Sequence, residues 1–293
     1  MVDLPTDPPA DPRTGWDLPT FGGMPTVAEL DEVTTRVLAA NASPMTLDGT
    51  NTYVLHPLGA GVAAIVDPGP DDPEHLAAVE RVLRAHDTWP TAVLVTHHHV
   101  DHAAAAWSWA DHFGARVHAS TRDVAGEDGH VIGDGSHVDL PGLRVEAVAT
   151  PGHCADHLAF RLGTGALLSG DHVLGRGTSV VAHPDGDLAA YLDSLRRVLD
   201  LGPDVLYPGH GPELTEDPEA VVRFYLDHRA FRERQVLAVL TAGDATPREV
   251  VEVVYAEVDP GLWPAAEAST RAALDRLATA GTVRFDGQVA SLA

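Results

Sequence analysis

The sequence contains no lysine, so all nineteen of its basic residues are arginine. The 43 acidic residues outnumber them and give a formal net charge of −24 at pH 7. A surface of this sign repels nucleic acid and anionic membranes at long range. The composition therefore argues against DNA as a partner, and it disfavours RNA unless a local group of arginines compensates.

Cysteine and long apolar runs are also scarce. The single cysteine, Cys154, excludes an intrachain disulfide and suits a reducing compartment. No apolar run approaches the roughly 20 residues of a membrane span. The acidic, proline-rich start MVDLPTDPPADPRTG lacks the basic and apolar regions of a secretory signal. We therefore expect a cytoplasmic protein that does not bind a membrane.

Residues 1–28 predict an irregular arm, because prolines recur through it. Beyond the arm, short apolar and β-branched runs alternate with segments of helical periodicity, which include 73–86 and 188–199. Strands are predicted at 33–39, 52–55, 62–66, 92–96, 143–149, 157–162, 166–168 and 204–209. This order predicts a layered α/β domain with mixed sheets over residues 1–215.

The pattern changes after residue 215. Three helices are predicted at 218–240, 245–258 and 264–281, with Thr246 as the cap of the second and Gly281 at the end of the third. The last segment, TVRFDGQVASL, predicts two short strands around an Asp-Gly turn. Residues 216–293 therefore predict a small, mostly helical, winged-helix-like domain.

Histidine is concentrated in LVTHHHVDHAAAA, where a buried strand gives way to a helix. On an extended segment, side chains two residues apart share a face, so His97 and His99 can bind one metal ion together. Asp101 and His102 follow at the turn. Three further candidates, His153, Asp171 and His210, each follow another strand-like run. Five imidazoles and two carboxylates suit two divalent ions, with Zn²⁺ the default and Mn²⁺ or Fe²⁺ as alternatives.

These motifs resemble those of the metallo-β-lactamase-fold hydrolases across about residues 30–215. The segments that carry the resemblance are GTNTYVL, IVDPGP, THHHVDH, TPGHCADH, SGDHVLG and PGHGP. The resemblance implies a four-layer αββα sandwich with a metal site at one edge of two packed sheets. It also implies that one ion is held by His97, His99 and His153, that a second is held by Asp101, His102 and His210, and that Asp171 bridges the two.

Further segments are most similar to the β-lactamase-like protein 2 group, namely SGDHVLGRGTSVV, YLDSLRR, YPGHGPEL and LDHRAFRERQVL. Members of that group include endoribonucleases, and fungal polyketide thioesterases lie nearby. True β-lactamases of this fold lack the bridging aspartate, so Asp171 argues against antibiotic hydrolysis.

The expected enzyme is a dinuclear metal-dependent hydrolase that uses a metal-bridging hydroxide, generated near neutral pH because metals lower the pKa of bound water. Asp101, Asp171 and His210 are the candidate catalytic residues. Arg176 and His183 are candidate substrate-binding residues. Near the ligands, His98 is expected to face away from the metals and Asp156–His157 to orient ligands, while Cys154 is expected to pack as a small side chain.

Three functions remain open from the sequence. The preferred substrate is a small ester or thioester, in which case the tail acts as a lid or as a homodimer contact and the aromatic residues Phe224, Tyr225 and Phe231 pack on the metal domain. The alternative is a single-strand-directed endoribonuclease that relies on Arg229, Arg232 and Arg234. The tail itself carries 13 acidic and 8 basic residues from Glu216 onward, which disfavours that alternative. A metal-sensing regulatory protein is the third possibility.

Overall fold

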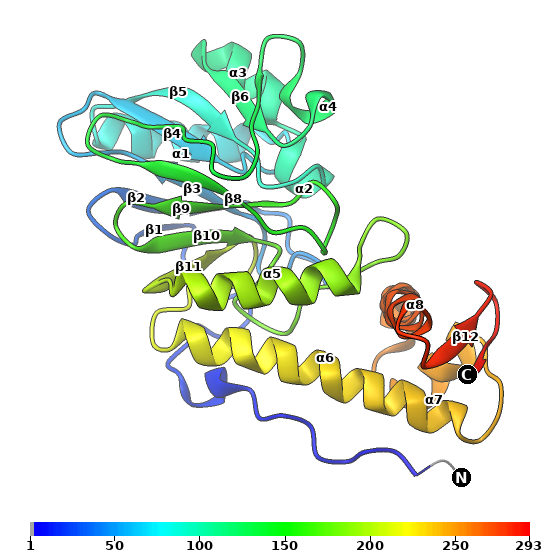
Figure 1. The fold of residues 1–293 in the computed structure, drawn as a ribbon. Helices are drawn as coiled ribbons and strands as arrows, with labels where there is room; N and C mark the ends of the chain where they lie inside the picture. The colour runs from blue at the N-terminus through cyan, green and yellow to red at the C-terminus, as the bar shows by residue number, and fades with distance from the viewer. Residues whose placement is uncertain (1–2) are drawn as a thin grey trace.

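Two β-sheets packed face to face form the centre of the larger domain in the computed structural model, which describes residues 3–293 (Figure 1). The first sheet has seven strands in chain order, antiparallel from β1 to β4 and parallel from β4 to β7. They are β1 (Val27–Glu29), β2 (Thr34–Leu38), β3 (Asn51–Leu55), β4 (Val62–Val66), β5 (Trp89–Leu94), β6 (Arg116–Ala119) and β7 (His130–Val131).

The second sheet has four strands in the order β11-β10-β9-β8, with β10 and β11 parallel and the other pairs antiparallel. They are β8 (Val145–Ala149), β9 (Leu158–Leu162), β10 (Ala166–Gly170) and β11 (Val205–Pro208). Side chains alternate across a strand. Leu94 therefore packs with Phe160 and Leu168 between the sheets, whereas its neighbour Val93 packs on the opposite face.

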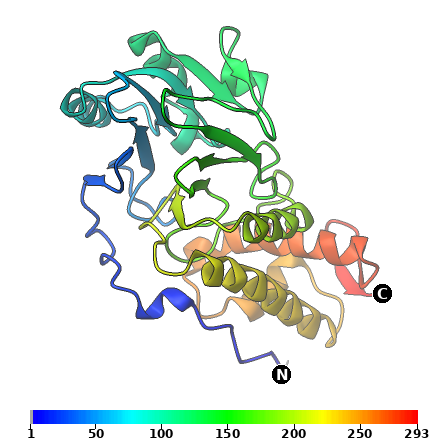
Figure 2. The same ribbon diagram turned by 60° about the vertical axis from the view of Figure 1, so that its left-hand side comes forward.

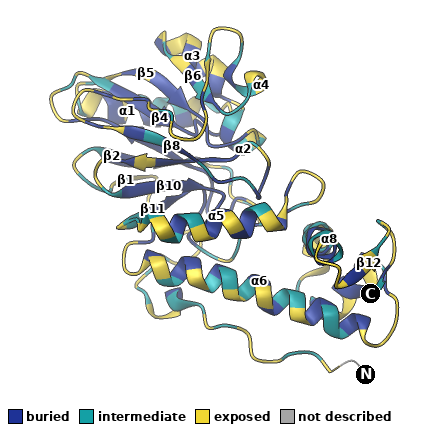
Figure 3. Ribbon diagram, in the orientation of Figure 1, coloured by how far each residue is buried: buried dark blue, intermediate teal, exposed yellow. Residues whose placement is uncertain are grey.

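Helices cover both outer faces and complete the four layers (Figure 3). On the first sheet lie α1 (Pro73–Ala85) and α3 (Ala106–Phe113), with the short α2 (Val100–Ala103) before α3 and α4 (Arg122–Ala125) after β6. On the second sheet lies α5 (Leu188–Leu201). Asp72 and Asp187 cap α1 and α5 by accepting hydrogen bonds from first-turn amides. The αββα sandwich expected from the sequence is confirmed.

The C-terminal part consists of three helices and a hairpin. They are α6 (Pro218–Leu240), α7 (Pro247–Val254), α8 (Trp263–Thr279), β12 (Val283–Phe285) and β13 (Ala290–Leu292), with a 3-10 turn, η2 (Pro260–Leu262), before α8. Thr246 caps α7 as predicted, in a capping box with Glu249. Figure 2 shows α5, α6 and α8 side by side. The winged-helix-like tail is confirmed.

Helix α6 contributes to the core beneath the second sheet and to the core of the C-terminal part. Val221 and Tyr225 in its first half pack with α5 and the second sheet, whereas Val236 and Leu240 in its second half pack with α7 and α8. A division at residues 215 and 216 therefore falls just before an element that joins the two parts, and it stays a prediction.

The N-terminal arm lies along α6 and is not wholly irregular. It contains a 3-10 turn, η1 (Pro12–Gly15), and ends in β1. Arg13 is buried and donates hydrogen bonds to the carbonyl oxygens of Leu174 and Gly177 at 2.9 and 2.7 Å. Its contacts explain why a segment rich in proline is ordered. Within residues 3–293, none of the helices combines the length and apolarity that a bilayer crossing requires.

Candidate metal centre

All seven predicted ligands lie in segments that follow the carboxyl ends of strands, five in loops and Asp101 and His102 in the short helix α2. His97, His99, Asp101 and His102 come after β5 and at the start of α2. His153 follows β8, Asp171 follows β10 and His210 follows β11. The packing of the two sheets brings these loops to one edge of the sandwich, so residues up to 113 positions apart in the chain, His97 to His210, meet there.

The first group of ligand atoms comes from three histidines. His99 Nδ1 lies 3.0 Å from His97 Nε2 and 3.0 Å from His153 Nε2. One oxygen of Asp171, Oδ2, lies 3.7 Å from the same nitrogen of His153. We refer to His97, His99 and His153 as the first set.

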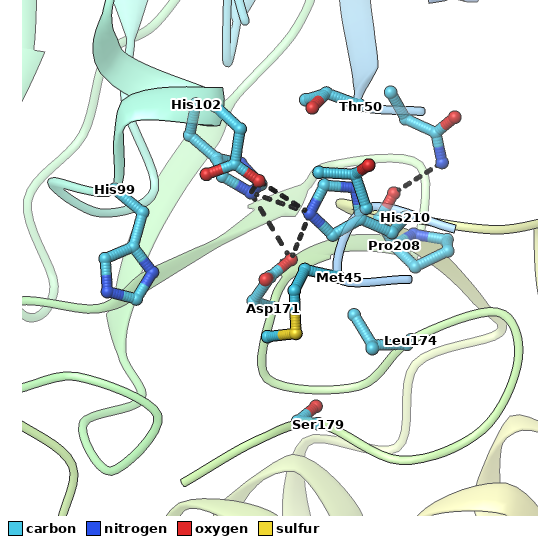
Figure 4. A network of polar contacts seen from close by, with 12 residues as sticks. Met45, Thr50, His99, His102, Asp171, Leu174, Ser179, Pro208 and His210 are labelled. Carbon is cyan, nitrogen blue, oxygen red and sulfur yellow. Dashed lines mark hydrogen bonds and ion pairs between the residues drawn. The ribbon is translucent and has the colours of Figure 1, made fainter. Parts of the chain in front are cut away.

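The second group lies beside the first (Figure 4). His210 Nε2 lies 3.2 Å from His102 Nε2 and 3.2 Å from Asp101 Oδ2. The other oxygen of Asp171, Oδ1, lies 3.4 Å from both of these histidine nitrogens. We refer to Asp101, His102 and His210 as the second set. Asp171 stands between the two sets and directs one oxygen to each.

Each of the five histidines has a partner on its outward nitrogen. His102 Nδ1 lies 2.8 Å from Asp67 Oδ2, and His99 Nε2 lies 3.3 Å from Asp185 Oδ2. The other three partners are the Thr96 hydroxyl for His97 and the carbonyl oxygens of Val180 and Gly49 for His153 and His210. Because carbonyls and carboxylates only accept, these outward nitrogens donate, and a neutral ring then turns its lone pair towards the site.

This donor set fits divalent ions. Lone pairs only about 3 Å apart repel one another unless a cation lies between them. Burial, together with the neighbouring rings of His102 and His153, holds the pKa of His97 well below its usual range, so this ligand is neutral. In the second set, burial disfavours protonated rings, but Asp171 outweighs it and raises the pKa of His102 well above its usual range and that of His210 to about 9. The charges on these two rings in turn outweigh the burial of Asp171 and hold the pKa of its carboxyl well below the usual range, so a divalent ion would replace two protons here.

Two further observations support the fit. Asp171 Oδ1 is buried and accepts no hydrogen bond from any residue that the structure describes. Gly209 leaves space beside it, since a Cβ at this position would lie 2.6 Å from Asp171 Oδ1 and 2.8 Å from His102 Cε1. A side chain here would fill the space between ligands, so glycine keeps the centre of the site open.

The comparisons with known proteins agree with this geometry. Residues 45–210 match the Metallo-beta-lactamase superfamily, and residues 246–291 match the Beta-lactamase associated winged helix domain. The chain belongs to the metallo-β-lactamase superfamily. It is a hydrolase of this fold followed by the winged-helix domain that accompanies it in related proteins.

Relatives within the superfamily extend over most of the chain. It is 34% identical to the Beta-lactamase-like protein 2 homolog of Drosophila melanogaster, over 89% of this chain and 93% of the relative. It is also 34% identical to the Atrochrysone carboxyl ACP thioesterase of Aspergillus chevalieri, over 80% of this chain and 77% of the relative. The crystal structure of a Beta-lactamase domain protein from Burkholderia ambifaria matches with a TM-score of 0.77 and 22% identity, over 95% of this chain and 96% of that one. The resemblance to the β-lactamase-like protein 2 group is confirmed.

Asp67, at the end of β4, supports both sets of this superfamily site and was missed as a functional residue. Its Oδ2 lies 2.8 Å from His102 Nδ1 and accepts a 2.7 Å hydrogen bond from the Thr96 hydroxyl. That hydroxyl in turn accepts from His97 Nδ1 at 2.9 Å. Asp67 has a positive φ of 50°, which is rare for a non-glycine residue and marks a constrained position. The motif IVDPGP contained this residue, but no local pattern indicated its partners.

The residues next to the ligands have distinct contacts. His98 points outward, with Nδ1 2.7 Å from Asp156 Oδ1. His157 is buried and its Nε2 accepts a hydrogen bond from the Asp171 amide at 3.1 Å, so it holds the backbone of the shared carboxylate. Burial, followed by the carboxylate of Asp156, raises the pKa of the Cys154 thiol far above its usual range, and this cysteine is not an activated nucleophile.

The two candidate substrate-binding residues are engaged with other protein groups. Arg176 lies 3.4 Å from Asp48 Oδ2 and donates to the carbonyl oxygen of Pro19. His183 pairs with Asp275 of α8 at 2.8 Å. Neither side chain points into the two ligand sets, and their roles in substrate binding stay predictions.

His75 supports Asp67 from behind the site, and its burial leads us to expect that the stability of the protein depends on pH. Its Nε2 donates to the Thr52 hydroxyl, which donates to the Asp67 carbonyl oxygen. Burial lowers the pKa of His75 to about 4. Below the ordinary histidine pKa of about 6.5, the unfolded chain gains a proton here that the folded chain rejects until about pH 4.

We therefore expect neutral His75 to make its full contribution to the free energy of unfolding above pH 6.5. This contribution should be lost as the pH falls towards 4. Between pH 7.5 and pH 5 this amounts to about 2 kcal/mol. Urea unfolding of wild type and His75→Gln at both pH values measures it, since the variant lacks this titration. If the difference in free energy of unfolding between wild type and His75→Gln were the same at pH 7.5 and pH 5, the assignment would be wrong.

Proposed function

We propose that this protein is a dinuclear metal-dependent hydrolase that cleaves a small ester or thioester. One observation carries the proposal: the two oxygens of Asp171 are directed at two separate sets of ligand atoms, Oδ2 at the first and Oδ1 at the second. A carboxylate placed in this way is suited to bridge two ions about 3.5–4 Å apart.

His97, His99 and His153 would hold one ion, and Asp101, His102 and His210 the other, with Asp171 shared. Imidazole and carboxylate ligands favour Zn²⁺, with Mn²⁺ or Fe²⁺ as alternatives. When bound, the ions would supply a water that loses its proton near neutral pH and would polarise the scissile carbonyl.

The chain's own residues define where the substrate enters. Most ligand side chains are buried, but His99 and Asp101 are 34% and 28% exposed and form the rim of the site. Asp101 would therefore be placed to orient an attacking water. His210 lies behind Asp101, in contact with its carboxylate, and would keep that carboxylate in position. Met45 is 52% exposed and appears in Figure 4 together with Asp171 and His210, so it is a candidate apolar contact for an acyl group.

The basic side chains predicted to bind substrate lie against other protein groups, which favours a carbonyl substrate over a phosphodiester. Arg176 is paired with Asp48 and His183 with Asp275. Arg229, which was proposed above as an RNA contact, is buried and donates to the Ser179 carbonyl oxygen. Tyr225 is fully buried against the larger domain, which fits a tail that packs on the metal domain as a scaffold. The thioesterase name of the Aspergillus relative points to the same substrate class.

The scarcity of cysteine supports a cytoplasmic location, and we propose one. Cys154 is the only cysteine and is buried, so this chain does not depend on an oxidising compartment. The winged-helix tail would act as a scaffold at the side of the site. We infer that it does not bind nucleic acid, because Arg229 and Arg232 are both engaged within the protein.

The zinc-loaded protein is expected to hydrolyse members of an acyl-thioester panel with turnover on the order of 1–1000 s⁻¹, measured by release of free thiol. It should not cleave single-stranded RNA at physiological salt, since the acidic surface repels the backbone. The metal-free protein is the control. RNA cleavage that falls steeply with rising salt and is lost on replacing the exposed Arg234 would overturn the substrate class in favour of the endoribonuclease.

A further inference from the structure

The segment of residues 179–185, between β10 and α5, carries the outward partners of two histidines in the first set. The Val180 carbonyl oxygen accepts from His153 Nδ1 at 2.6 Å. Asp185 Oδ2 accepts from His99 Nε2 at 3.3 Å. The orientation of both rings therefore depends on where this one segment lies.

The winged-helix domain holds the same segment at two points. On α6, the guanidinium of Arg229 donates to the Ser179 carbonyl oxygen, next to Val180, and lies 5.2 Å above the ring of Tyr191. Arg229 is only 8% exposed, so this hydrogen bond is shielded from water.

The second point of contact is on α8. Asp275 Oδ2 lies 2.8 Å from His183 Nδ1, two residues before Asp185, in a close contact without hydrogen-bond geometry. The amide of His183 also donates to the Ala268 carbonyl oxygen, at 3.4 Å. The segment is thus fixed at both of its ends by helices of the C-terminal domain.

The second set is supported from other places. The outward partners of His102 and His210 are the Asp67 carboxylate and the Gly49 carbonyl oxygen. Both belong to loops around the first sheet, and neither Arg229 nor Asp275 forms a hydrogen bond or an ion pair with them. Arg229 and Asp275 therefore brace the first set of ligands and not the second.

We propose that Arg229 and Asp275 are positioning residues through which the winged-helix domain sets the affinity of the first set for its ion. The proposal rests on the dinuclear site proposed above. Partners of metal-bound histidines change metal affinity by about 10- to 100-fold when they are removed. Arg229 and Asp275 act one contact further out, so we expect the lower end of that range.

The test uses the full-length protein and Zn²⁺ in competition with a chelating indicator. The variants are Arg229→Met, Arg229→Lys and Asp275→Asn, each made also in an Asp101→Asn background that isolates the first set. Arg271→Met is the matched control, because Arg271 lies on α8 but bonds only to Glu267 and Gly287. Arg229→Met and Asp275→Asn should weaken binding at the first set about tenfold. The second set should not change, and Arg229→Lys should recover most of the affinity because lysine can still donate to Ser179.

Hydrogen exchange of the metal-free proteins gives a second readout that needs no ion. The amides of His183 and Gly186 are hydrogen-bonded and should exchange faster in Arg229→Met and Asp275→Asn than in wild type or Arg271→Met. Asp275 is 44% exposed, so Asp275→Asn keeps the test valid if Arg229→Met does not fold.

The outcomes separate the two proposals. A wild type that binds fewer than two ions would overturn the dinuclear site. A wild type that binds two, with both variants unchanged in first-set affinity or with both sets weakened equally, would overturn the bracing role alone.

Discussion

Replacing His99 with alanine is expected to remove one of two bound ions and to lower turnover by more than about 100-fold. This loss exceeds the loss of about 10- to 100-fold that follows when only the hydrogen-bond partner of a metal-bound histidine is removed. His99 Nδ1 lies 3.0 Å from the ligand nitrogens of both His97 and His153, so it occupies the middle of the first set. A site with three histidine donors binds its zinc ion far more weakly when one donor is removed. Elemental analysis of protein purified without chelator, together with turnover on the best thioester, measures both effects.

His98→Ala is the matched control, because it removes the adjacent imidazole, whose nitrogens lie near Asp156 and Asp185 and not in the two ligand sets. The His98 ring contacts Asp156 Oδ1 at 2.7 Å and Asp185 Oδ2 at 3.5 Å, away from the ligand atoms. Both ions should stay bound in this variant, and turnover should change little. Equal metal loss from the two substitutions would show that the alternation from His97 to His99 is wrong.

Periodicity predicted the fold well, because its signals are local. The helix predicted at 218–240 is α6, with the same bounds. The strand predicted at 92–96 is β5, Trp89–Leu94, and the alternation beyond it brings the ligand nitrogens of His97 and His99 within 3.0 Å of each other. Burial of one face of a strand decides which side chains point inward, and the sequence records that pattern directly.

The supports of the site could not be predicted in the same way. Val180 and Gly49 contribute backbone carbonyl oxygens, which every residue type possesses, so no sequence pattern marks them. Asp67 lies 35 residues from His102 and meets it only because β4 and β5 are neighbours in the sheet. Such contacts depend on tertiary packing, and a single sequence carries no record of it.

Arg176 shows that tertiary contacts can also give a predicted functional residue a structural role. Its position five residues after Asp171 made it a reasonable clamp for an anionic substrate. The fold instead places it beside Asp48 and the Pro19 carbonyl oxygen, both more than 100 residues away in the chain. An exposed arginine and a structural one look alike in sequence, because the partner that decides between them is distant.

The second large effect is expected from Asp171→Asn. Asparagine keeps the size of the side chain and the amide that donates to His157, but it offers one oxygen in place of two and no charge. The NH2 group must then face either the first set, where Oδ2 lies 3.7 Å from His153, or the second set, where Oδ1 lies 3.4 Å from His102 and His210.

Whichever set receives the NH2 group loses a ligand and gains a donor that repels the ion. We therefore expect this variant to bind fewer than two ions. Its turnover should fall by more than about 100-fold, which is the largest loss that follows from removing a hydrogen-bond partner of a metal ligand. Asp185→Asn is the control, because Asp185 contacts only the outward nitrogen of His99 within the first set and its oxygen can still accept a hydrogen bond after the change. That control should keep both ions. If Asp171→Asn instead bound two ions with wild-type turnover, the two oxygens of Asp171 would not both be ligands, and the shared carboxylate on which the proposed function rests would be wrong.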